Sequence, residues 1–240
     1  MDRRRAGRTP VPQGLGHSPS PPVCRGWLMT SSTTAVRPRW QAELAVVLDA
    51  FLVRRNQAVD FDRAGLAACR RGLSKKPMDI PAMFQYIAPV SLAVPARWGP
   101  QAQARVEAAA HYTLALYAFH QQSQDRRMHQ PSQGRQRTTV GRAAGRLHQA
   151  LQSTSPEGVD RRFLAAATAD SIEEVVGHLR VLVPQLRQHA IPMDYLALAA
   201  DLESWPVPEL RAQTRRRWGL DYRWIPSTED DQDDTTDTYS

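Results

Sequence analysis

The sequence from Thr138 to Trp205 reads TTVGRAAGRLHQALQSTSPEGVDRRFLAAATADSIEEVVGHLRVLVPQLRQHAIPMDYLALAADLESW. From about Val140, apolar side chains recur at about 100° per residue, which predicts an amphipathic helix. Arg142 and Arg146 lie one turn apart on the side opposite the apolar stripe. We interpret the stretch as a small helical bundle whose outer surface carries arginines.

Three further helices are predicted within this stretch. The first has Arg161 away from its apolar face and Arg162 at the margin. The second opens at Ser171–Glu174 with the Ser-x-x-Glu spacing of a capping box, and Arg180 follows one edge of its apolar stripe. Pro192 suits the first turn of the third.

The rest of the chain is also predicted to be helical. Helices are expected over residues 39–57, from Asp60 or Asp62 to Leu73, in a short corner that Pro89 ends, over 101–122 and from Pro208. No segment alternates with period two as a strand does. The expected fold is all-α, with helical-bundle subdomains at 38–122 and 138–225 joined by a flexible basic loop at 123–137. Residues 1–37 and 226–240 contain few apolar side chains, so we expect both to be disordered.

The charge of the chain is unevenly distributed. The net charge is +7. The first 39 residues hold seven arginines and one aspartate, and the last 15 hold six acidic residues and no basic ones. The part between them therefore keeps the full excess of positive charge. This excess favours a polyanionic partner such as nucleic acid. The alternative is that arginines away from the apolar faces are simply solvated.

Motifs of catalysis and metal binding are absent from the sequence. It has no Gly-rich phosphate loop, no His-Glu-x-x-His and no Gly-x-Ser-x-Gly. Cys24 and Cys69 are too few for a disulfide framework or a cysteine-rich zinc site. His111 and His120 are too far apart on their helix to share a metal ion. We expect no enzymatic activity, no cofactor and no metal site.

The sequence shows neither a membrane span nor a secretory signal. No apolar run reaches the length of a span, and the N-terminus lacks an apolar segment before a cleavage site. We expect a cytoplasmic protein without a membrane partner. Most aromatic residues fall on predicted core stripes, with Trp98 as a possible exception. The predicted mode of binding is therefore salt-dependent contact with phosphates, without sequence preference.

Three blocks of sequence, in order, resemble a known family. Asp79-Ile-Pro-Ala-Met-Phe84 with Ala88-Pro89 is similar to its "D-I-P-A-F-Y…P" corner, and Val140-Gly141-Arg142-Ala143 to its "L-G-R-A-L" helix start. Asp160-Arg161-Arg162-Phe163 through Leu179-Arg180 resembles its "E-R-R…L…L-R-x-L-L" helix pair. The family is CasB, the small subunit of the type I-E CRISPR surveillance complex Cascade.

The resemblance implies an all-α, non-catalytic subunit. Its implied partners are the other Cascade Cas subunits, the CRISPR guide RNA, the target DNA and a second copy of itself as a dimer. Its implied function is to hold the target and displaced strands of the R-loop in antiviral defence. The positions that match basic family positions are Arg70, Arg71, Arg142, Arg161, Arg162 and Arg180. The further candidates for nucleic-acid contact are Lys75, Lys76, Arg135, Arg137 and Arg146.

Two other functions remain open from the sequence. A helical adaptor could use the same basic face to bind an acidic protein, with no nucleic-acid role. Binding that ignores salt and persists without nucleic acid would favour the adaptor. An enzyme would require a shared polar cleft that sequence spacing does not reveal.

Overall fold

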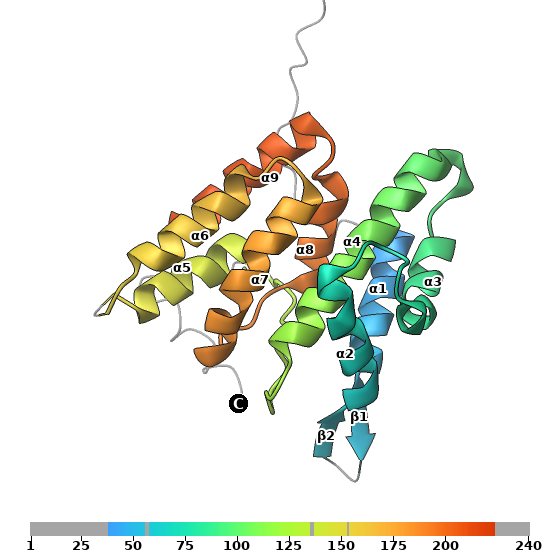
Figure 1. Ribbon diagram of the computed structural model, residues 1–240, viewed down its shortest axis with the longest axis horizontal. Helices are drawn as coiled ribbons and strands as arrows, with labels where there is room; N and C mark the ends of the chain where they lie inside the picture. Colours follow the sequence, from blue (N-terminus) through green and yellow to red (C-terminus); the bar gives the residue numbers. More distant parts are fainter. Residues whose placement is uncertain (1–37, 56–57, 135–136, 153, 224–240) are drawn as a thin grey trace, which may run out of the picture. The chain divides into compact units, whose positions relative to one another are not determined.

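The computed structural model describes residues 38–55, 58–134, 137–152 and 154–223. The predicted disordered tails and Arg135 lie outside these residues. With η for a 3₁₀ helix, the elements are α1 Arg39–Ala50, β1 Leu52–Arg55, β2 Ala58–Phe61, α2 Arg63–Arg70, η1 Arg71–Ser74, η2 Pro81–Met83, α3 Phe84–Leu92, η3 Ala96–Trp98, α4 Gly99–His120, α5 Val140–Ala150, α6 Glu157–Thr168, α7 Ile172–Gln188, α8 Tyr195–Ser204 and α9 Pro208–Arg223 (Figure 1). The predicted all-α fold is confirmed for the described residues, apart from one short hairpin.

That hairpin corrects the predicted first helix. The helix ends at Ala50, and β1 then pairs antiparallel with β2, with Leu52 opposite Phe61. The Asp62 N–H donates to the Phe51 carbonyl at 2.8 Å, which closes the ladder. The segment contains two valines, and β-branched residues favour extended backbone over helix. The prediction of helix is therefore wrong for residues 51–55, while residues 56–57 lie outside the described residues.

Two predicted helix boundaries near the corner are resolved by the structure. The carboxylate of Asp62, and not Asp60, caps α2 by accepting from the Gly65 N–H at 2.9 Å. Pro89 does not end α3, which continues to Leu92. Pro89 lies on the exposed side of α3, where the carbonyl that loses its helical partner can be hydrated.

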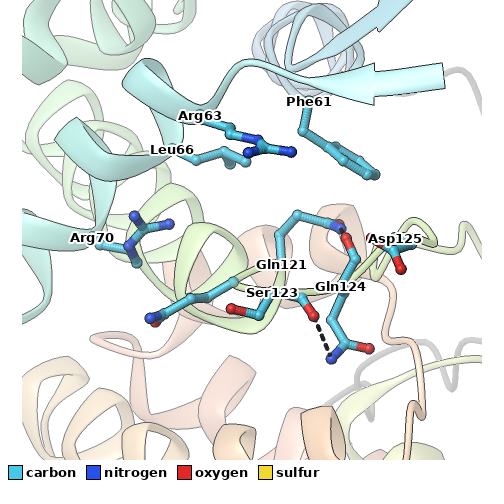
Figure 2. A pocket seen from close by; sticks show the side chains of 9 residues that line it. Phe61, Arg63, Leu66, Arg70, Gln121, Ser123, Gln124 and Asp125 are labelled. Atoms are coloured by element: carbon cyan, nitrogen blue, oxygen red, sulfur yellow. Dashed lines mark hydrogen bonds between the residues drawn. The ribbon is translucent and has the colours of Figure 1, made fainter.

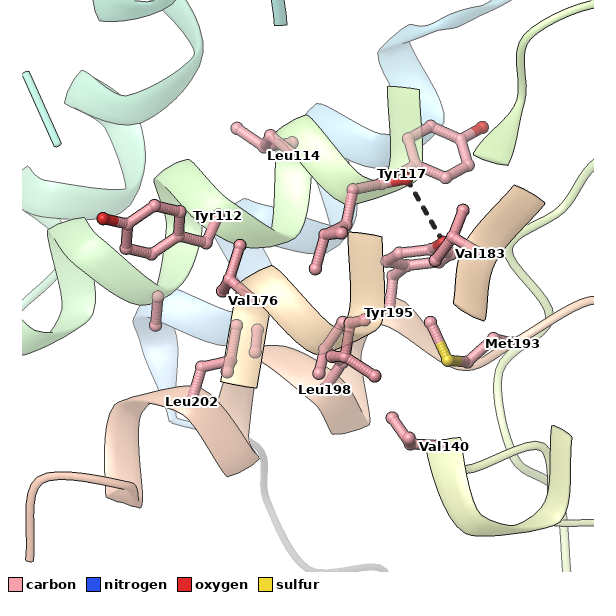
Figure 3. Close-up of a cluster of buried hydrophobic side chains, with 14 of the residues drawn as sticks. Tyr112, Leu114, Tyr117, Val140, Val176, Val183, Met193, Tyr195, Leu198 and Leu202 are labelled. Carbon is pink, nitrogen blue, oxygen red and sulfur yellow. Dashed lines mark hydrogen bonds between the residues drawn. The ribbon is translucent and has the colours of Figure 1, made fainter. Parts of the chain in front are cut away.

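Helix α4 is buried on nearly all sides and forms the centre of the fold. It packs against α2 and α3 and also against α7 and α8. Figure 3 shows Tyr117 of α4 beside Tyr195 of α8, with ring centroids 5.2 Å apart, and Leu114 on the opposite side of α4. Buried side chains from both predicted halves thus form one continuous cluster. The boundary between two subdomains at 122 and 138 stays a prediction.

The C-terminal helices form two packed pairs, α5 with α9 and α6 with α7. Thr139 caps α5 through its hydroxyl, and the predicted Ser171 cap of α7 is confirmed, with Ser171 Oγ accepting from the Glu174 N–H at 3.1 Å. Helix α8 begins at Tyr195 with Asp194 as its cap, so Pro192 lies before the helix and not in its first turn.

The segment after α4 is an ordered structure where it is described. Gln121 is buried, and its side chain donates to the Arg126 carbonyl at 2.8 Å and accepts from the Met128 N–H at 2.9 Å. Backbone hydrogen bonds then join Gln130 and Met128 to Met193. The Gln121 amide thus supplies hydrogen-bond partners to the backbone of this segment, and its flexibility stays a prediction.

Candidate nucleic-acid interface

Three of the predicted cations line one hollow beside α7. Lys75 and Lys76, which follow η1, meet Arg180 of α7 in a depression of about 260 Å³. All three side chains are exposed. Glu173 is an acidic residue of the same lining. Lys75 and Lys76 lie near α7 because η1, which precedes them, and α7 both pack on α4.

A second hollow lies on the other side of the exposed face of α7. Arg161 and Arg162 of α6 line it together with His178 and Val181 of α7, and its volume is about 310 Å³. Arg161 is exposed, whereas Arg162 is half-buried and donates to the Gly158 carbonyl at 3.0 Å. This lining contains two arginines and no carboxylate.

The face of α7 between these hollows is open and carries a glycine. Gly177 lines the first hollow and Val181 lines the second, and the two residues are neighbours one turn apart on the exposed side of α7. A Cβ at Gly177 would meet no atom within 4 Å, and Val181 is 50% exposed. Glycine within a helix costs about 1 kcal/mol relative to alanine, and here packing does not require it. The α7 backbone at Gly177 is therefore not covered by any described side chain.

Arg142 and Arg137 belong to the contact between α5 and α9 instead. Arg142 is 4% exposed, so the prediction that it lies on an outer surface is wrong. Burial lowers the pKa of Arg142, and the nearby carboxylate of Asp221 opposes that effect. Arg137 Nη1 donates to the same carboxylate at 2.9 Å. A second helix, α9, covers the side of α5 that the helical pattern assigned to solvent.

The remaining candidates are dispersed. Arg70 is half-buried and lines a separate pocket near the end of α4, while Arg71 is exposed on η1. Arg146 is half-buried on α5, close enough to Arg142 to lower its pKa. Arg135 lies outside the described residues. The structure therefore brings together only part of the predicted set.

Several other arginines hold the fold together. Arg215 donates to the Thr168 and Ala169 carbonyls at the end of α6, at 2.8 and 2.6 Å. Arg217 pairs with the buried Asp201. Arg187 donates to the Phe119 carbonyl at 3.1 Å. Arg187, Arg215 and Arg217 therefore have structural partners within the protein.

Sequence reasoning did not identify Gly177 and His178 as part of the surface. Glu174 lies one turn before His178, and the two side chains are 3.8 Å apart. Of these two residues, only Gly177 could have been identified from the sequence. A glycine in the middle of a capped helix destabilises the helix, so its presence there suggests a packing or functional role. In the described residues, no group of three or more His, Cys, Asp or Glu side chains is placed to hold a metal ion. None of the described helices is long and apolar enough to cross a membrane.

Comparison with known proteins identifies the family. The model of the CRISPR-associated protein Cse2 family matches residues 65–222, more than half of the chain. The chain belongs to the Cse2 family. The match includes Lys75, Lys76, Gly177 and Arg180, and thus both hollows beside α7.

Solved structures agree with this assignment of the Cse2 chain. CasB from Thermobifida fusca is 28% identical with a TM-score of 0.60, over 77% of this chain and 96% of that one. A chain of a CRISPR RNA-guided surveillance complex has the same fold, with 23% identity and a TM-score of 0.53 over 76% of this chain and 92% of that one. No curated protein sequence matches the Cse2 chain.

Proposed function

We propose that this Cse2-family chain is a non-catalytic subunit of a CRISPR RNA-guided surveillance complex. It binds nucleic-acid backbones without sequence preference and stabilises the R-loop. Its partners are the other subunits of the complex, the guide RNA, the target DNA and a second copy of itself. The membership in the Cse2 family and the likeness to CasB support this assembly. In such complexes, guide pairing selects the sequence while protein cations hold the strands.

One observation carries the proposal: cations from three separate segments converge on one face of α7. In the described part of the chain, no carboxylate forms an ion pair with Lys75, Lys76, Arg161 or Arg180. Their charges are therefore available to phosphates. Arg142 is not included in this surface because its side chain is buried.

Removing three cations from the surface should weaken binding strongly. At 0.1 M salt, K75A/K76A/R180A should lower the affinity for single-stranded DNA by roughly 30- to 100-fold, and the slope of log K against log salt should fall by about two, since each phosphate contact contributes about 0.7 to that slope. Fluorescence anisotropy with a labelled 30-mer measures both quantities.

The matched control removes three exposed arginines elsewhere: Arg97, Arg216 and Arg223. The control variant should keep most of its affinity. Equal losses in the two triple variants would show that net charge, and not the α7 surface, determines binding. Binding that is unaffected by salt would instead favour the acidic protein partner. In the reconstituted complex, the first triple variant should shorten the lifetime of the R-loop more than the control does.

Adding bulk and charge at Gly177 tests the same surface without removing a cation. G177E should weaken single-stranded DNA binding by tenfold or more, because the new carboxylate stands between the two hollows. Its melting temperature should not fall, because a Cβ there meets open space and glutamate favours helix. G219E is the control, since Gly219 of α9 is also open. If G177E binds like the parent, the surface is assigned to the wrong place.

A further inference from the structure

A larger pocket lies away from the α7 surface, between α2 and the loop that follows α4. Its volume is about 430 Å³, within the range of small-molecule sites. Figure 2 shows Phe61, Arg63 and Leu66 on one side and Gln121, Ser123 and Gln124 on the other. Arg70 and Asp125 lie at opposite ends of the view.

One side of the pocket offers an aromatic ring at a partly open position. Phe61 is half-buried at the end of β2, and Leu66 beside it is buried in α2. Sequence analysis placed most aromatic residues in the core and expected phosphate contacts alone. Phe61 also packs against the core, but the hairpin, which the helical prediction missed, places it at the edge of a pocket as well.

The opposite side is held rigid and is polar. Gln121 fixes the loop by donating to the carbonyls of Gln124 and Arg126, at 3.1 and 2.8 Å. Ser123 has a φ of 57°, a left-handed conformation that costs energy for a residue other than glycine. The loop thus presents the Asp125 carboxylate and Gln124, whose amide also donates to the Ser123 carbonyl at 3.3 Å, to the pocket.

The two ends of the pocket differ in charge. Half-buried Arg70 supplies a guanidinium group at one end, the guanidinium group of exposed Arg63 lies beside Phe61, and Asp125 is exposed at the other end. Guanidinium groups bind phosphate, and a carboxylate accepts from the amino group of a base such as cytosine. Aromatic stacking beside a cationic groove is typical of proteins that bind single strands.

We propose that this pocket takes one unpaired nucleotide of a single strand. Its base lies against Phe61 and Leu66, its amino edge faces Asp125 and Gln124, and its phosphate lies at Arg70 and Arg63. The inference rests on the proposed function, since the α7 surface must hold the strand, but it adds a contact to a base. A subunit of this kind would hold a displaced strand by stacking as well as by charge.

The test compares a deoxycytidine 20-mer with an abasic strand of the same length. The parent should bind the base-bearing strand about tenfold more tightly, since stacking on an aromatic side chain is worth a factor of this order. F61L should reduce that ratio to about one while leaving the affinity for the abasic strand unchanged, and F61Y should restore the ratio. W98L is the control, because Trp98 is an aromatic residue, 40% exposed, outside the pocket. Ribocytidine strands show whether the pocket distinguishes RNA from DNA.

A second measurement does not depend on the stability of F61L. Photo-cross-linking of a strand that carries 5-iodocytosine, followed by mass spectrometry of the parent protein, should place the adduct on the peptide that contains Phe61. An adduct on Trp98 would contradict the proposal that the pocket binds a nucleotide. Equal affinities of the parent for the base-bearing and abasic strands would contradict it as well. The K75A/K76A/R180A variant should lose affinity for both strands equally. If this variant keeps its affinity for both strands, the proposed role of the α7 surface is wrong, independently of the result for the pocket.

Discussion

Replacing Gly141 by alanine is expected to destabilise the protein by about 3 kcal/mol or more. A Cβ at this position would lie 3.0 Å from the Trp218 Cα and closer still to its carbonyl oxygen. The obstacle is the backbone of α9 and not a flexible side chain, so the two helices must move apart. For a chain of this size, the melting temperature should fall by roughly 6–12 °C. Thermal unfolding followed by circular dichroism measures the change.

The control for this prediction lies on the helix that Gly141 contacts. G219A adds a Cβ to α9 where nothing lies within 4 Å, so it should leave the protein as stable as before or up to about 1 kcal/mol more stable. Gly145 of α5 approaches α9 in the same way, since a Cβ there would lie 2.6 Å from the Tyr222 carbonyl oxygen, and G145A should also destabilise. Equal stability of G141A and G219A would contradict the close packing of α5 and α9.

The protein is also expected to lose stability in acid because of a buried histidine. Burial lowers the pKa of His120 to about 3, and the nearby Arg187 and Arg126 contribute to this shift. Its Nδ1 lies 2.9 Å from the Tyr195 hydroxyl. Above pH 6.5 the imidazole is neutral in both the folded and the unfolded chain. Between pH 6.5 and about 3 only the unfolded chain binds this proton, so each pH unit of acidification costs about 1.4 kcal/mol.

Urea unfolding at pH 7.0, 6.0, 5.0 and 4.5 tests this prediction with H120Q as the comparison. The glutamine amide can still hydrogen-bond to Tyr195 but does not titrate. The free energy of unfolding of the parent should therefore fall by about 1.4 kcal/mol per pH unit more than that of H120Q. Burial raises the pKa of Asp201 to about 6, so this residue shifts stability with pH in the opposite direction. Because Asp201 is present in both proteins, its contribution cancels when the two free energies of unfolding are subtracted. Parallel curves for parent and variant would contradict a neutral buried His120.

The helices of the C-terminal part could be predicted because their signals are local. The Ser171 cap and the apolar stripe of α7 depend on side chains three or four residues apart, and neighbours at that spacing determine a helix. The start of α9 at Pro208 was predicted for the same reason, and Asp62 was one of two candidate caps for α2. Where two local signals competed, as between Ala50 and Phe61, the helical pattern gave the wrong structure.

The candidate surface was predicted only in part. The residue types at 75–76, 161–162 and 180 were identified from charge and resemblance, but their convergence beside α7 depends on how α6 and η1 pack around it. Arg142 shows the same limit in reverse. A position opposite the apolar stripe faces solvent only when no second helix packs on that side of the helix. In α5, helix α9 packs there and buries Arg142.

The sequence by itself determined the helical class, most helix starts, the excess of positive charge and the resemblance to the family. These properties depend on composition and on neighbours within one or two helical turns. Only the tertiary structure decided which arginines remain exposed, why Gly141 must be small, and where Phe61 lies. Each of these depends on contacts between residues tens of positions apart. The periodic pattern of one helix does not indicate which other helix packs against its polar side.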